Sequence, residues 1–73
     1  GAELRGIDPV SGDLIRLFHP RLDEWREHFE VNKDTARIVG ITPVGRATVD
    51  RLKLNSASQQ LARRQWIRLG VFP

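Results

Sequence analysis

The chain has 73 residues, no cysteine and a formal net charge of +3. A sequence this short is expected to form one domain, 1–73, because it can bury only about 60% of its unfolded surface. The lack of cysteine excludes disulfides, thiolate zinc sites and a cysteine nucleophile. No apolar run approaches the roughly 18 residues that a membrane span needs, so we expect no membrane partner and a cytoplasmic location.

Charge is divided unevenly between the two halves of the chain. Residues 1–35 carry five basic and eight acidic side chains, whereas residues 36–73 carry seven basic side chains against Asp50 alone. This segregation favours contact with a polyanion through the C-terminal half. Attraction between the two halves inside the fold would produce the same pattern, and the sequence leaves that alternative open.

The first third of the chain predicts a turn, a strand and a short helix. Residues 6–12 form loop and turn, because they contain an Asp-Pro pair and a glycine that can adopt a positive φ. Residues 14–18 are an apolar, β-favouring run that ends before Pro20. Residues 21–28 have helical spacing, with Leu22 and Trp25 on one face.

A hairpin and a capped helix come next. Alternating side chains predict strands at residues 29–31 and 36–41, joined by a four-residue loop that suits a type I turn. Thr42-Pro43 is a strong helix start, because threonine can cap free N–H groups and proline fits the first helical position. This helix is expected to run to about Leu54, with Asn55 closing it in the left-handed conformation.

Ser56 or Ser58 is expected to cap a final helix, and Gly70 is placed to end it, with Val71 packing back near Trp66. Leu61, Ala62, Trp66 and Leu69 would be its inward stripe. The order of elements predicts an α+β fold in which a small β-hairpin or three-stranded sheet packs against two to three short helices. The expected core anchors are aromatic: Phe18, Trp25, Phe29 and Trp66, with Phe72 as a further candidate.

Residue types that carry chemistry are sparse. His19 and His28 lie in different elements without a third ligand at suitable spacing, so we expect structural roles for both. His19 would make a backbone hydrogen bond at a strand end, and His28 would cap the last carbonyls of the short helix. We assign no catalytic residue, no metal ligand and no cofactor, because phosphate-loop, dinucleotide and zinc-knuckle patterns are also missing.

The candidate binding residues are cations. Gly45 and Arg46 at a helix start could hold a phosphate, although Gly45 could equally serve to bring the helix close to the sheet. Arg64 and Arg68 are four residues apart and share a helix face, but a solvated face would look the same. The residues assigned to contact DNA or RNA are Arg46, Arg51, Lys53, Arg63, Arg64 and Arg68.

Three motifs between residues 6 and 48 are distinctive. They are Gly6-Ile7-Asp8-Pro9-x-x-Gly12, Leu17-Phe18-His19-Pro20-Arg21 and Gly40-Ile41-Thr42-Pro43-x-Gly45-Arg46-Ala47-Thr48. Together with Trp25, His28-Phe29 and Leu54-Asn55, they resemble the C-terminal part of small bacterial HNH endonucleases. The resemblance covers about residues 6–55 and continues more loosely to residue 73.

In those enzymes the catalytic ββα-metal motif and the paired Cys-x-x-Cys zinc ligands precede this stretch. Neither is present here, so the resemblance transfers no catalytic or metal-binding residue. It implies a non-catalytic accessory domain in a nucleic-acid context. Three origins remain open: a fragment of a longer nuclease, a small natural protein derived from such a tail, or a tail reused as an inhibitor or adaptor.

The alternative function is a protein-interaction module, whose acidic first half or basic second half binds a charged protein partner. A stand-alone nuclease is the least favoured reading, because phosphodiester hydrolysis needs a metal-activated water or a positioned base.

Overall fold

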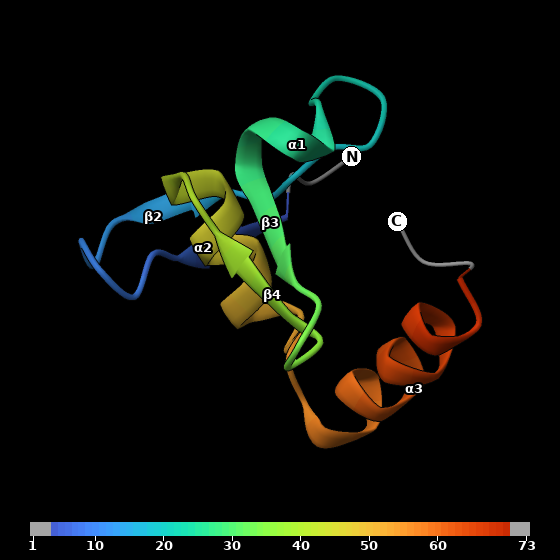
Figure 1. Ribbon diagram of the computed structural model, residues 1–73. Helices are drawn as coiled ribbons and strands as arrows, with labels where there is room; N and C mark the ends of the chain where they lie inside the picture. The colour runs from blue at the N-terminus through green and yellow to red at the C-terminus, as the bar shows by residue number, and fades with distance from the viewer. Residues whose placement is uncertain (1–3, 71–73) are drawn as a thin grey trace.

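The computed structural model describes residues 4–70, and over this range it has two antiparallel hairpins and three helices (Figure 1). The elements in chain order are β1 (Arg5–Ile7), β2 (Leu14–Arg16), α1 (Trp25–His28), β3 (Phe29–Asn32), β4 (Arg37–Gly40), α2 (Pro43–Arg51) and α3 (Ala57–Arg68). The predicted α+β class is confirmed. The strands form two separate two-stranded sheets, β1–β2 and β3–β4, and not one sheet of three.

The first hairpin contains a strand that the sequence pattern did not reveal. Strand β1 pairs antiparallel with β2, so that Gly6 lies opposite Ile15. The connecting loop closes through a hydrogen bond from the Asp8 N–H to the Asp13 carbonyl, and Gly12 adopts the positive φ that we expected. Strand β1 escaped detection because it is only three residues long, and arginine and glycine are two of them.

Helix α2 packs closely against the second hairpin and against β1. A Cβ atom on Gly45 would lie 2.0 Å from the His28 carbonyl oxygen, so only glycine allows the two backbones to approach this far. Thr42 caps the helix by accepting a hydrogen bond from the Gly45 N–H at 3.0 Å, as predicted. The buried apolar residues are Leu17, Phe29, Ala36, Ile38 and Ala47.

Helix α1 is half as long as predicted. Residues 20–23 form a turn, in which the His19 carbonyl accepts hydrogen bonds from the N–H groups of Leu22 and Asp23. Leu22 is 81% exposed and therefore contributes nothing to the core. The helix begins at Trp25, because the Asp23 side chain holds the preceding turn closed through a hydrogen bond from the His19 N–H.

Two of the expected aromatic anchors are not buried. Trp25 remains 37% exposed although its ring centroid lies 5.1 Å from that of Phe29, and Trp66 is 51% exposed. Phe29 is the central anchor at 2% exposure, and Phe18 meets it edge-on at 5.3 Å. The predicted core positions of Val71, packed near Trp66, and of Phe72 lie outside the described residues.

The C-terminal helix projects from the rest of the molecule (Figure 1). Helix α2 ends at Arg51, earlier than predicted, and Lys53 (φ 50°) takes the left-handed conformation expected of Asn55. Ser56 occupies the N-cap position of α3, but its side chain makes no capping hydrogen bond, so the predicted position is confirmed and the predicted cap is not. Gly70 lies just beyond the helix with a positive φ, as predicted. The predicted inward stripe is wrong, because Leu61, Trp66 and Leu69 are all exposed.

Within residues 4–70, no helix is long and apolar enough to cross a lipid bilayer.

Replacing Phe29 tests this description of the core. We expect Phe29→Ala to lower the free energy of unfolding by about 3–5 kcal/mol, because the ring is buried and the site cannot fully collapse. The exposed Leu22→Ala is the matched control and should change it by no more than about 0.5 kcal/mol. Thermal or urea unfolding measures both variants, and equal losses would contradict the assignment of Phe29 as the anchor.

Candidate nucleic-acid interface

Arg46 is partly buried and forms an ion pair with Asp8. Its Nε and Nη2 atoms donate to the two carboxylate oxygens of Asp8 at 2.9 and 2.8 Å. The Asp8 side chain is fully buried and also accepts from the Val10 N–H and the Ser11 hydroxyl. The two hydrogen bonds from Arg46 hold the pKa of the Asp8 carboxyl far below its usual range, and in return they raise the pKa of Arg46.

The pairing of Arg46 leaves little of the predicted phosphate cradle at the start of α2. The Gly45 N–H donates to the Thr42 cap, and two of the three guanidinium nitrogens of Arg46 donate to Asp8. Of the two roles considered for Gly45, the structure supports the close approach between helix and hairpin.

Arg63 is buried as well, at 4% exposure. Its Nη1 donates to the Ala36 carbonyl at 2.5 Å, and its Nη2 donates to the Leu54 carbonyl at 2.6 Å. Burial lowers the pKa of this guanidinium, because the charged form loses contact with water. Arg63 therefore does not belong to the surface on which the sequence placed it.

The four remaining predicted cations are exposed, at two different places. Arg51 and Lys53 lie at the end of α2, whereas Arg64 and Arg68 lie along α3. The second pair borders a cleft. The cleft has a volume of about 400 Å³ and separates α3 from the β3–β4 loop. We call it the basic cleft, and its lining residues are Lys33, Asp34, Arg64, Ile67 and Arg68.

Lys33 is the member of this cleft that sequence reasoning missed. It lies in the loop between β3 and β4, within the acidic half of the chain and 31 positions before Arg64. No local pattern links it to α3, because only the direction in which that helix projects brings the two together. The loop itself is held by Asn32, whose side-chain oxygen accepts from the N–H groups of Asp34 and Thr35.

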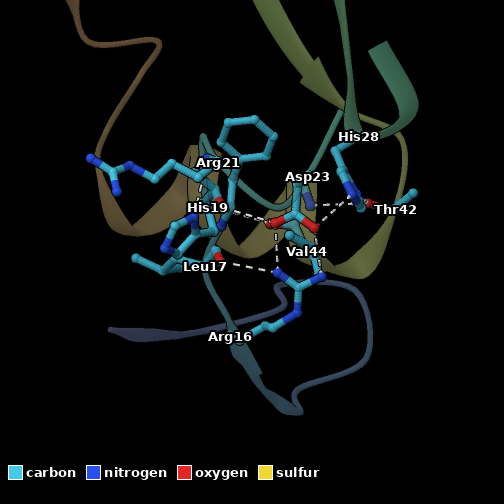
Figure 2. A network of polar contacts seen from close by, with 11 residues as sticks. Arg16, Leu17, His19, Arg21, Asp23, His28, Thr42 and Val44 are labelled. Atoms are coloured by element: carbon cyan, nitrogen blue, oxygen red, sulfur yellow. Dashed lines mark hydrogen bonds and ion pairs between the residues drawn. The ribbon is translucent and has the colours of Figure 1, made fainter. Parts of the chain in front are cut away.

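A second polar network joins the first hairpin, α1 and the start of α2 (Figure 2). Arg16 donates to both carboxylate oxygens of Asp23 at 2.6 and 2.9 Å, and the His19 N–H donates to the same carboxylate at 2.8 Å. The hydrogen bonds from Arg16 lower the pKa of Asp23 to about 2. His28 lies at the other side, with its Nε2 at 3.8 Å from Asp23.

The two histidines are therefore structural, although only one acts as predicted. The Nδ1 atom of His19 accepts from the Arg21 N–H, which confirms a backbone hydrogen bond at the strand end. The prediction for His28 is wrong: its Nδ1 shares a hydrogen bond of 2.6 Å with the Thr42 hydroxyl and does not cap α1. Asp23, His28 and Thr42 have the residue types of a nucleophile relay, but the Thr42 oxygen is engaged as the cap of α2.

Among residues 4–70, no group of three or more histidine, cysteine or acidic side chains lies close enough to hold a metal ion. Comparison with known proteins adds no relative: no family model, curated protein or solved structure matches the chain.

Acid unfolding tests the two ion pairs. Asp8 and Asp23 both have folded pKa values below the ordinary value of an aspartate carboxyl. A depressed folded pKa stabilises the fold above the unfolded pKa, and this stabilisation is lost as the pH falls through the folded value. We expect stability to decline from about pH 4 towards pH 2, because both carboxylates then become protonated only at the cost of their ion pairs.

In Asp23→Asn the ion pair with Arg16 is absent, so its contribution to the fall in stability is absent too. The stability of this variant should therefore depend less on pH between about pH 4 and pH 2. Glu30→Gln, at an exposed strand position, is the control and should keep the curve of the unmodified protein. Chemical denaturation at a series of pH values measures the three curves. An Asp23→Asn curve as steep as that of the unmodified protein would contradict the assigned role of the pair.

Proposed function

We propose that the chain is a non-catalytic accessory domain that contacts the phosphates of DNA or RNA through the basic cleft. The observation that carries the proposal is the meeting of Lys33, Arg64 and Arg68 around one cleft, where Asp34 is the single acidic lining residue. Two elements contribute these cations, so a phosphate in the cleft would be contacted from both sides.

The chemistry of the three side chains suits a phosphodiester backbone. A guanidinium presents a planar fork of donors that can bind two phosphate oxygens, and an ammonium supplies a compact point charge. Arg64 and Arg68 are one helical turn apart on the same face of α3. Ile67 lies between them and makes part of the cleft apolar. We expect the affinity for phosphates to depend on the charge and shape of the cleft rather than on recognition of the bases.

A relation to the tails of bacterial HNH endonucleases is part of this proposal. The proposed relation rests on the motifs of residues 6–55, and the contacts in the fold explain why residues of two of these motifs are needed. Asp8 and Arg46 come from different motifs and form a partly buried ion pair, while Gly45 provides the close approach of α2. A nucleic-acid partner would also agree with a cytoplasmic location.

A protein-interaction module is the second candidate, and α3 supplies the observation in its favour. Leu61, Trp66 and Leu69 are exposed on this helix, and phosphate binding does not require them. Apolar side chains on a projecting helix are a frequent feature of protein contact surfaces. A pulldown from the native host separates the candidates, because recovery of a protein partner without nucleic acid would support this one and oppose the first.

Salt dependence of binding tests the proposed function. We expect the affinity for a short duplex or single strand to fall linearly with salt on a logarithmic scale. Each of Lys33→Gln, Arg64→Gln and Arg68→Gln should lower the slope by about 0.9 for duplex or about 0.7 for single-stranded nucleic acid. Fluorescence anisotropy with labelled oligonucleotides measures these slopes.

Arg26→Gln, on α1 outside the cleft, is the matched control, and it should leave the slope unchanged. An affinity that stays flat between low and moderate salt would overturn the proposal. A plasmid-nicking assay with Mg²⁺, Mn²⁺ or Zn²⁺ completes the test, and cutting by the purified chain would refute a non-catalytic role.

A further inference from the structure

The attachment of α3 rests on an unusual residue. Arg63 is the buried residue of α3, whereas the apolar side chains of the helix, Leu61, Trp66 and Leu69, are exposed. Helix α3 also projects from the body of the molecule and does not lie flat against it (Figure 1). The helix is therefore held by a charged side chain, in the place where a leucine or isoleucine would normally be found.

The two arms of the Arg63 guanidinium reach two different segments. One binds the carbonyl of Ala36, at the end of the loop that carries Lys33, and the other binds the carbonyl of Leu54, in the connection between α2 and α3. Nearby, the Asn55 side chain accepts from the Ile38 N–H and donates to the Ile38 carbonyl, both at 2.7 Å. The loop, the α2–α3 connection and α3 thus meet at Arg63.

Backbone conformation points to the same junction. Among the described residues, Ala36 and Lys53 are the two non-glycine residues with positive φ, at 61° and 50°. A left-handed conformation is unfavourable for both residue types and persists only when the surroundings hold it. Ala36 itself provides one carbonyl that Arg63 binds, and Lys53 directly precedes Leu54, which provides the other.

We propose that Arg63 is a positioning residue of the basic cleft. By joining α3 to the end of the β3–β4 loop, it fixes the direction of the helix and so holds Arg64 and Arg68 opposite Lys33. Arg63 itself contacts no phosphate. Lysine cannot replace it, because one ammonium group does not reproduce the rigid fork that reaches two carbonyls at once. The ligand of the cleft rests on the proposed function, whereas the role of Arg63 in fixing the direction of α3 does not depend on it.

Two substitutions test it, Arg63→Met and Arg63→Lys. Amide hydrogen exchange followed by NMR reports the order of α3 directly. We expect α3 amides to exchange about tenfold faster or more in Arg63→Met, while amides of α2 and β3 keep their protection, because the ion pair of Arg46 and the Phe29 core are untouched. Arg63→Lys should lie between Arg63→Met and the unmodified protein, and it keeps the test usable if Arg63→Met does not fold.

Coupling to Lys33 separates positioning from direct contact. In the unmodified protein, Lys33→Gln should lower the salt slope of oligonucleotide binding. In the Arg63→Met or Arg63→Lys background it should lower the slope much less, because the cleft has already come apart. If Lys33→Gln lowers the salt slope equally in both backgrounds, Arg63 does not position the residues of the cleft, and the proposal is overturned.

The two readouts distinguish the failure of each idea. If the unmodified protein binds no oligonucleotide, the proposed function fails, and the exchange rates of α3 alone decide whether Arg63 holds the helix. If α3 amides keep full protection in both Arg63 variants, the positioning role fails whatever the binding data show.

Discussion

The structure depends on two guanidinium groups that hold its parts together, that of Arg63, which is buried, and that of Arg46, which is partly buried. The apolar core around Phe29 is small, and neither the first hairpin loop nor α3 inserts a large apolar side chain into it. Arg46 ties that loop to α2 through Asp8, and Arg63 ties α3 to the second hairpin through two carbonyls. Two nitrogens of each guanidinium donate to acceptors in the fold, and such hydrogen bonds offset the cost of removing the charge from water.

This arrangement also explains the uneven charge of the chain. Attraction between the two halves accounts for part of that pattern. The Asp8–Arg46 pair joins the acidic half to the basic half inside the fold, as intramolecular attraction would have it. Arg64 and Arg68 are left at the surface, where they meet Lys33, a cation from the otherwise acidic half. The basic half therefore supplies two structural arginines and two arginines of the cleft, while the acidic half supplies the third cation of the cleft.

Local patterns predicted the elements whose signals are local. The β3–β4 hairpin, the Thr42 cap and the left-handed Gly70 follow from alternation, capping and glycine at a helix end. Strand β1 was missed, because it depends on pairing with β2 and has almost no propensity of its own. Trp25 and Trp66 were misplaced in the core, because aromatic type and helical spacing do not report whether another element covers the helix.

Only part of the candidate site could be predicted from the sequence, for a related reason. Arg64 and Arg68 could be paired by spacing along one helix, but Lys33 joins them only through the direction in which α3 projects. That direction depends on Arg63, which looks like any other surface arginine until the carbonyls of Ala36 and Leu54 are placed around it. The burial of Arg63 depends on tertiary contacts, and no neighbouring residue in the sequence indicates it.

The most direct test of this division between inner and outer arginines is NMR of the guanidinium N–H groups during titration with an oligonucleotide. The account predicts slow exchange with water and unchanged shifts for Arg46 and Arg63, with Arg64 and Arg68 exchanging fast and shifting as the ligand is added. Fast exchange and early shifts at Arg46 and Arg63 would contradict it, because those two side chains would then be part of the surface.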